Sequence, residues 1–430
     1  WQRTMTHQRV TPTDDLATIV IGMNQSNSGG QSFSDDNEWR ARAEDAIPGG
    51  SSTGSKRAAA LYGSASHDSR LPTHYERANG CALYTTEGSR LIDCSMALGA
   101  VAIGYADPSV TRAVHEAATN GNVTGLPHRL EVEVAERLIE VIPCAEQVRF
   151  LRTGAEANAA AIRTARTLTG KTHIIACGYF GWLDWCSHGA GIPESANASI
   201  TWVPFNDLLA LEIAVSQYEV DLAAIIIEPL VETMAAVEWL QMARELCTNY
   251  GAVLIFDEVK TAFRIQTGGV QALLEVEPDL TTIGKALANG YPLSALVGRA
   301  GAMEAIGKTW ISSTAAAEST GLAAAIAVLE WHDRVDVCDR LSLIGESMQR
   351  SIARGLAAVP ELSVRAEGVP QMWRLVADNP SDLDSLVAAA TRHGVLLKRG
   401  AYQFASLAHD DEALKIIEEG VAKAARDVVA

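Results

Sequence analysis

Residues 221–259 read DLAAIIIEPLVETMAAVEWLQMARELCTNYGAVLIFDEV, and this stretch decides the fold class. Two apolar runs, AAIII and AVLIF, each end at an acidic residue, and an amphipathic segment separates them. Continuous apolar runs of this length predict strands buried on both faces, and a helix between two such strands predicts a parallel pair. We therefore expect an α/β architecture built on a mostly parallel sheet.

The same alternation continues on both sides of this stretch. Further strands are expected in THIIACG, SITWVPF and LSALVGR, and two short strands in GCALYTTEGSRLIDCSMALGAV around the turn TEGSR. Asp107 is placed to cap a helix in DPSVTRAVHEAATNG that ends at Gly121. Residues 320–352 are predicted to form one long helix that leads into shorter mixed segments.

A chain of 430 residues with 48% hydrophobic content exceeds what one compact domain usually holds. Residues 1–38 are rich in Ser, Gly, Asn and Asp and are predicted to form a polar arm. We expect a large domain over residues 96–320 and a smaller α+β domain from residues 39–95 and 321–430.

The charge pattern excludes several classes of partner. The formal charge of -17 comes from 35 basic and 52 acidic residues without a long run of either sign, which argues against nucleic acid and anionic membranes. No apolar run approaches the roughly 20 residues that span a bilayer, and the first thirty residues lack a signal peptide's apolar core. Seven cysteines without a C-x-x-C pair favour the reducing cytoplasm, and the ten histidines show no metal-binding spacing. Small-molecule chemistry is the function class that remains.

Three charged residues lie at positions of the predicted sheet where a ligand is expected to bind. Glu228 and Asp257 follow buried strands, and ligands of parallel sheets bind beyond the carboxyl ends of strands. A helix cap is the alternative for each acid. Lys285 comes 28 residues after Asp257, in TTIGKALANGYPLSALVGR, among small residues that leave room for a bulky group. Because burial of an unpaired ammonium is costly, a lysine in such a segment indicates a function.

A lysine beside an acid in an apolar α/β cleft fits pyridoxal phosphate (PLP). This cofactor needs an amine for a Schiff base and a carboxylate against its ring nitrogen, and Lys285 and Asp257 supply the two groups. Thr153, Gly154 and Ala155 open the helix of RTGAEANAAAIRTAR, where free N–H groups and the helix dipole favour a phosphate. The Thr-x-x-Glu capping box at the same place would explain the motif without a phosphate.

An aromatic ring to stack on the cofactor is the last requirement. The run CGYFGWLDWC follows a predicted strand and offers Tyr179, Phe180, Trp182 and Trp185. Aromatic clusters are common in protein cores, but glycines flank this one at a strand end. Its position favours Tyr179 as the stacking residue.

Together, IFDEVKTAFR, PDLTTIGKALANGYPLSALVGR, RTGAEANAAAIRTAR and GYFGW resemble the class III PLP-dependent aminotransferases. The likeness runs from about residue 48 to 414 and is strongest to the branch of glutamate-1-semialdehyde aminomutase. It implies the type I PLP-dependent aminotransferase fold and a homodimer with active sites at the subunit interface. The implied reaction moves an amino group from an amine or amino acid to an oxo acid by a ping-pong mechanism.

The resemblance also implies roles for individual residues. Lys285 matches the Schiff-base lysine and Asp257 the partner of the pyridine nitrogen, while Val259 matches a residue that packs on the ring. The remaining matches are Gly154 and Ala155 in the phosphate turn, Tyr179 as the stacking tyrosine, Glu228 as the acid of a strand-end Glu-Pro, and Thr314 as a threonine that reaches the phosphate of the neighbouring subunit.

Several departures from the family leave alternatives open. Ala155 replaces a phosphate-binding threonine, and Phe180 replaces a histidine after the stacking tyrosine. Ala401 stands where the aminomutase carries a glutamate, which favours two-substrate transamination over a 2,1-aminomutase. A non-catalytic PLP-binding structural or regulatory homologue is a further alternative, against which the intact Lys285 and Asp257 argue.

The segment GGSSTGSKRAAALYG admits two interpretations. It resembles the part of the family that reaches the substrate, so Lys56 or Arg57 would clamp a substrate carboxylate. A flexible basic loop is the alternative. A nucleotide-binding P-loop is disfavoured because Ser55 separates Gly54 from Lys56 and no strand precedes the segment.

Overall fold

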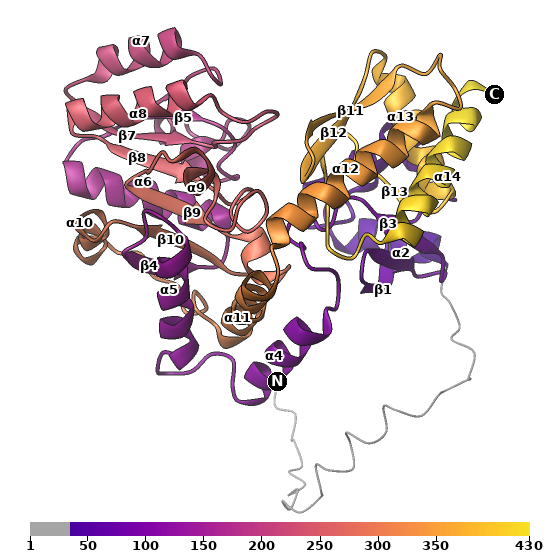
Figure 1. Ribbon diagram of the computed structural model, residues 1–430, viewed down its shortest axis with the longest axis horizontal. Coiled ribbons are helices and arrows are strands. Elements are labelled where there is room, and N and C mark those ends of the chain that lie inside the picture. The colour runs from indigo at the N-terminus through magenta and orange to yellow at the C-terminus, as the bar shows by residue number, and fades with distance from the viewer. Residues whose placement is uncertain (1–34) are drawn as a thin grey trace, which may run out of the picture.

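The computed structural model describes residues 35–430, so the predicted polar arm lies outside the described residues except at its end. That end belongs to helix α2, which begins at Asp36. Figure 1 shows two lobes, one around a large sheet and one around smaller sheets, with a long helix running between them. Within residues 35–430, no helix is long and apolar enough to cross a membrane.

The large sheet has seven strands in the order β4-β10-β9-β8-β7-β5-β6. Neighbours from β6 to β9 pair in parallel, whereas β10 is antiparallel to both β9 and β4. The predicted mostly parallel sheet is thus confirmed, and the predicted apolar runs all form strands of it. The strands are β4 (Gln147–Leu151), β5 (His173–Cys177), β6 (Ile200–Trp202), β7 (Leu222–Ile227), β8 (Val253–Asp257), β9 (Leu280–Ile283) and β10 (Ser294–Gly298).

Helices cover both faces of this sheet, which explains why its strands are apolar throughout. Alternate strand residues enter two separate cores, with Ile226 and Ile255 in one and Ile225 and Leu254 in the other. The helices on the first face are α6 (Gly154–Thr169) and α10 (Ala300–Met303), and those on the second are α7 (Leu208–Tyr218) and α8 (Val237–Tyr250).

The second lobe contains a four-stranded sheet, β1-β2-β3-β13, and a three-stranded sheet, β11-β12-β14. These strands come from both ends of the described chain. They are β1 (Tyr75–Asn79), β2 (Ala82–Thr85), β3 (Arg90–Asp93), β11 (Val364–Val369), β12 (Met372–Ala377), β13 (Val395–Leu396) and β14 (Tyr402–Phe404). The domain boundaries near residues 95 and 320 remain a prediction.

The remaining α-helices are spread over both lobes and the region between them (Figure 1). The predicted helix after Asp107 is confirmed as α4, because the Asp107 carboxylate accepts from the N–H groups of Ser109 and Val110. These helices are α2 (Asp36–Ala46), α3 (Ala58–Tyr62), α4 (Pro108–Thr119), α5 (Arg129–Val141), α9 (Val270–Leu274), α11 (Ser319–Arg334), α12 (Val337–Leu356), α13 (Pro380–Arg392) and α14 (Asp411–Val429).

The single long helix predicted over residues 320–352 was wrong. The structure has two helices there, α11 and α12, separated by Val335 and Asp336 in extended conformation. The Asp336 carboxylate accepts from the N–H group of Asp339 and begins the second helix. An aspartate inside an apolar periodic pattern can therefore mark a new helix start rather than a solvent-facing position.

The close approach of α12 to the β11–β12 turn gives a test of the packing. A Cβ on Gly345 would stand 1.8 Å from the carbonyl oxygen of Pro370, whereas a Cβ on Gly301 would meet nothing within 4 Å. We expect Gly345→Ala to lower the free energy of unfolding by about 1–3 kcal/mol because backbone must move. Gly301→Ala, the matched control inside helix α10, should leave it unchanged or raise it by up to about 1 kcal/mol. Urea unfolding midpoints measure both, and equal midpoints would contradict the packing.

Candidate active site

The three charged residues singled out in the sequence lie at one edge of the large sheet. Strands β7, β8 and β9 are adjacent and parallel, with Ile227 opposite Phe256 and Asp257 opposite Thr282. Glu228 and Asp257 are both buried at the carboxyl ends of their strands. Lys285 comes two residues after β9 and begins the short 3-10 helix η6 (Lys285–Ala288). The edge therefore presents two acids and an amine to the same region.

Two hydrogen bonds hold the Asp257 carboxylate. Its Oδ2 accepts from the Asn158 amide at 2.7 Å, and its Oδ1 accepts from the Val259 N–H at 3.0 Å. Thr282 fixes the Asn158 amide in turn, because its hydroxyl donates to Asn158 Oδ1 at 2.7 Å. The pKa of Asp257 is raised to about 7, chiefly by burial and next by the Glu228 carboxylate, while both hydrogen bonds oppose the rise.

Sequence reasoning missed Asn158. The residue lies within the stretch RTGAEANAAAIRTAR, four positions after Gly154 on the buried face of α6. The sequence did contain a sign of its role: Asn158 is a polar residue among the alanines of the buried face of the helix. A buried polar side chain needs a hydrogen-bond partner. Its partner, Asp257, is 99 residues away.

Lys285 has an amine that is easier to deprotonate than that of an ordinary lysine. Its pKa is lowered to about 8, chiefly by burial and next by the ammonium of Lys260, while Asp257 and Glu228 oppose the change. The backbone of Lys285 has φ of 48°, in the left-handed region that costs a residue with a Cβ about 1–2 kcal/mol. Strain of this kind persists where the surroundings fix a residue in place for a function.

The start of helix α6 lies against the segment that follows Asp257. A Cβ on Gly154 would stand 2.9 Å from Cγ1 of Val259, so only glycine allows this approach. Thr153 and Glu156 form the predicted capping box, which leaves the N–H groups of Gly154 and Ala155 at the first turn without a partner inside the helix. Such N–H groups, at the positive end of the helix dipole, suit a phosphate.

The aromatic run after β5 divides into core and surface residues. Phe180 is buried and stacks between Trp185 and Trp202, with ring centroids 6.0 and 5.8 Å away. Tyr179 is 70% exposed, and its N–H donates to Glu228 Oε2 at 2.9 Å. The structure thus leaves the Tyr179 ring free to stack on a bound group. It also places a glutamate, Glu228, next to the backbone of that tyrosine.

Glu228 has a second partner that the sequence did not reveal. The ammonium of Lys260 lies 2.8 Å from Glu228 Oε1, so the two carboxylate oxygens are held by Lys260 and by the N–H of Tyr179. The signal for Lys260 was its place three residues after Asp257, in IFDEVKTAFR. A direct contact of Glu228 with the cofactor remains a prediction.

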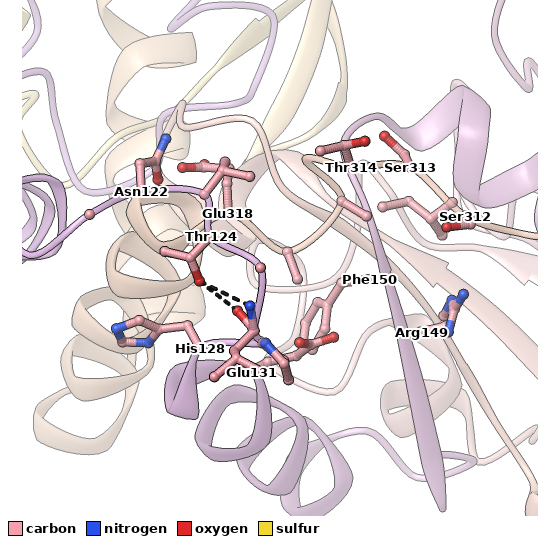
Figure 2. Close-up of a pocket in the computed structure, with 18 of the residues that line it drawn as sticks. Asn122, Thr124, His128, Glu131, Arg149, Phe150, Ser312, Ser313, Thr314 and Glu318 are labelled. Atoms are coloured by element: carbon pink, nitrogen blue, oxygen red, sulfur yellow. Dashed lines mark hydrogen bonds between the residues drawn. The ribbon is translucent and has the colours of Figure 1, made fainter.

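Thr314 lies apart from the residues at the strand ends. Figure 2 shows it with Ser312 and Ser313 at the rim of a pocket of about 470 Å³, across from Thr124 and His128. Neither Lys285 nor Asp257 lines this pocket. Arg152 connects its loop to the start of α6, since one guanidinium nitrogen donates to the Ala315 carbonyl at 3.3 Å.

Lys56 and Arg57 are also separate from the strand-end cluster. Lys56 lines a cavity of about 200 Å³ in the second lobe, together with Asp93 and Lys398. The Arg57 Nε donates to the carbonyl of Ser51 at 3.3 Å. The structure therefore gives neither Lys56 nor Arg57 a hydrogen bond or an ion pair with Lys285.

The raised pKa of Asp257 predicts how stability varies with pH. An unfolded aspartate titrates near pH 4, whereas the buried carboxyl keeps its proton up to about pH 7. Between these values the folded chain binds more protons than the unfolded chain, so the Asp257 contribution to the free energy of unfolding falls as the pH rises. Without cofactor, the parent should lose stability relative to Asp257→Asn between pH 4 and 7. Parallel curves in urea unfolding at several pH values would show that Asp257 titrates normally.

Comparison with known proteins identifies the family. Residues 63–189 and 192–421 match the profile of the family described as aminotransferase class-III. A 2'-deamino-2'-hydroxyneamine transaminase of Streptomyces kanamyceticus is 33% identical over 359 residues, which cover 81% of this chain and 90% of the relative. A glutamate-1-semialdehyde 2,1-aminomutase of Methanopyrus kandleri is 31% identical over 434 residues, which cover 91% and 97% of the two chains.

Solved structures show the same architecture. The PLP internal aldimine form of the FumI protein of Sphingopyxis sp. MTA144 superposes with a TM-score of 0.86 at 26% identity, over 92% of this chain and 96% of that chain. A transaminase with PLP bound has a TM-score of 0.83, also at 26% identity, over 93% and 99% of the two chains. The chain therefore belongs to the class III aminotransferases, enzymes that transfer amino groups with pyridoxal phosphate as their cofactor.

Proposed function

We propose that the transamination takes place at the strand-end cluster, with Lys285 as the reactive amine and Asp257 as the partner of the cofactor ring. The placement of these two residues at the carboxyl ends of adjacent parallel strands, next to the start of α6, is the observation that carries the proposal. Thr153, Gly154 and Ala155 would hold the phosphate. Val259 lies between the helix start and the strand ends, where it would pack on the ring.

The residues present fit this cofactor. When bound, pyridoxal phosphate supplies an aldehyde that condenses with amines and a ring that withdraws electrons from the substrate. Asp257, oriented by Asn158, would hold the proton of the ring nitrogen, and the exposed Tyr179 ring would cover the cofactor's face. The Lys285 amine would bind the aldehyde carbon and, once a substrate amine displaces it, would accept the proton from the substrate carbon.

The donor and acceptor are proposed to be two separate molecules, an amine or amino acid and an oxo acid. Ala401 stands where an aminomutase would carry a glutamate, so the chain lacks that group for an internal exchange. If the substrate bears a carboxylate, Lys56 is the better candidate to bind it, because its side chain lines a cavity whereas Arg57 is bonded to Ser51. Both residues remain proposals.

Absorption spectroscopy tests the site directly. The chain purified with pyridoxal phosphate should be yellow, and borohydride should fix the cofactor on Lys285. Lys285→Ala should lower the transamination rate by at least about a hundredfold, since the proton acceptor is gone. Exposed Lys423, changed to Ala, is the matched control and should leave the spectrum and rate unchanged.

Half-reactions separate the alternatives. An amino donor without an acceptor should release one oxo product per site and bleach the visible band. Turnover of a single substrate to its isomer, with no acceptor present, would indicate an aminomutase instead. A chain that binds the cofactor but reacts with no amine would favour the non-catalytic homologue.

We propose that the active form is a homodimer that forms over the pocket of Figure 2. Two residues that line this pocket expose apolar side chains: Leu126 is 80% exposed and Val123 is 46% exposed. Trp310, which precedes the lining residue Ile311 in the chain, is 82% exposed. Apolar groups clustered at a polar hollow are typical of protein interfaces. A second copy on this face would explain why Thr314 lies apart from Lys285, since it would serve the neighbouring site.

Charges at this face should separate the subunits. Leu126→Asp combined with Trp310→Asp would bury two carboxylates in the interface, so sedimentation should show a shift from two copies to one. The affinity for pyridoxal phosphate should fall at the same time, because Thr314 would no longer reach it. Val220→Asp is the matched control, because Val220 is 84% exposed and lies in the turn before β7, away from the pocket. A double variant that stays dimeric would place the interface elsewhere.

We also propose a cytoplasmic location. All seven cysteines are free and buried, and burial raises the pKa of several of their thiols, such as Cys247 to about 12. Thiols without disulfides support a reducing compartment.

A further inference from the structure

Lys260 is a second lysine at the carboxyl edge of the sheet. Its ammonium lies 2.8 Å from Glu228 Oε1, and the two side chains are only 12% and 4% exposed. The ring of Tyr402, from β14 of the second lobe, faces the ammonium at 5.1 Å from the ring centroid. Lys260 is therefore held between a buried carboxylate and an aromatic face.

The backbone places Lys260 next to Lys285. Strands β8 and β9 run in parallel, and the N–H of Glu258 continues their pairing by donating to the Thr282 carbonyl at 2.9 Å. A Cβ on Gly284 would stand 3.6 Å from Cγ1 of Val259. The residues immediately before the two lysines, Val259 and Gly284, thus lie close together, and both lysines follow the ends of adjoining strands.

The surroundings of Lys260 leave its ammonium little freedom. Glu228, its ion-pair partner, is fixed by the Tyr179 N–H, and the Tyr402 hydroxyl donates to the Val231 carbonyl at 2.5 Å. These contacts join the ends of β5 and β7 to the second lobe around a single positive charge. A charge fixed in this way acts on its neighbours without reorganising first.

The charged groups that face Lys285 are Lys260, Asp257, Glu228 and Arg264. The cations among them disfavour a protonated Lys285 and the acids favour it, with Lys260 acting more strongly than any of the others. The amine of Lys285 therefore has a like charge as its strongest electrostatic neighbour.

We propose that Lys260 is a positioning residue whose fixed ammonium keeps the amine of Lys285 unprotonated when that amine is free. Glu228 and Tyr402 hold the ammonium in place. The inference rests on the proposed function, because Lys285 must accept a proton from the substrate after it has been displaced. An amine that took a proton from solvent at that moment would lose its role as a base.

Competitive acetylation of the full chain without cofactor tests the proposal. Acetic anhydride labels only neutral amines, so peptide mass spectrometry over pH 6–11 gives the pKa of Lys285 with Lys423 as an exposed internal reference. The pKa of Lys285 should rise by about one unit or more in Lys260→Met, which removes the charge and keeps the chain length. Lys260→Arg, which keeps the charge, should stay within about 0.3 units of the parent. An unchanged pKa in Lys260→Met would overturn the proposal.

A double variant separates Lys260 from its partner. Lys260→Met alone leaves the Glu228 carboxylate unpaired, and that charge would itself raise the pKa of Lys285. Lys260→Met with Glu228→Gln removes both charges and leaves no buried charge unpaired, so it should also fold if the single variant does not. The reference is Glu228→Gln alone, which lacks the same carboxylate. A higher pKa of Lys285 in the double variant than in Glu228→Gln supports a direct effect of Lys260. Equal pKa values in these two variants would show that Lys260 acts only through Glu228.

The loaded enzyme gives a second readout. In Lys260→Met, the visible absorption band of the cofactor should titrate at a higher pH than in the parent. The acidic limb of the plot of kcat against pH should also move to higher pH, and kcat at high pH should return to the parent value. A purely structural role would lower the rate at every pH instead. Because the acetylation needs no cofactor, a parent chain that fails to bind pyridoxal phosphate would count against the proposed function and leave the lysine measurement valid.

Discussion

The parallel register of β7, β8 and β9 is the constraint on which the site depends. Helices cover both faces of the sheet, so no charged side chain can lie inside these strands without a high cost. Charges are therefore confined to the strand ends, and parallel pairing brings those ends to one edge. Glu228, Asp257 and Lys285 meet at this edge although they are up to 57 positions apart, the difference between 285 and 228.

Burial at this edge brings the pKa values of Asp257 and Lys285 close to each other. The pKa of Asp257 rises to about 7 and that of Lys285 falls to about 8, because each charged form is poorly solvated and has a like charge nearby. The cluster tolerates its two acids because each has a partner: Asn158 for Asp257 and Lys260 for Glu228. Burial of Asp257 and Lys285 costs stability, but it also gives both groups pKa values near neutral pH, where they can exchange protons.

The sequence predicted what depends on local pattern and missed what depends on contacts between distant segments. Apolar runs revealed β5, β6, β7, β8 and β10, but not β4 or β9. An acid directly after such a run revealed Asp257, and a lysine among small residues revealed Lys285. Asn158 and Lys260 were missed because their partners lie 99 and 32 positions away, the latter being the difference between 260 and 228. The break at Asp336 was missed because the apolar period continues through it, and only the hydrogen bond to Asp339 reveals the cap.

A buried arginine, Arg264, connects the segment that follows β8 to the second lobe. Arg264 is fully buried, and its guanidinium donates to the carbonyls of Ala405 at 2.7 Å and Gly99 at 3.0 Å while it faces the ring of Phe404 at 5.0 Å. These bonds hold β14 against the segment that follows β8, and β14 carries Tyr402. Since Tyr402 covers the ammonium of Lys260, a shift of this lobe would change the charge that Lys285 experiences. The proposed effect of Lys260 on the Lys285 amine would therefore depend on how β14 is held against the large lobe.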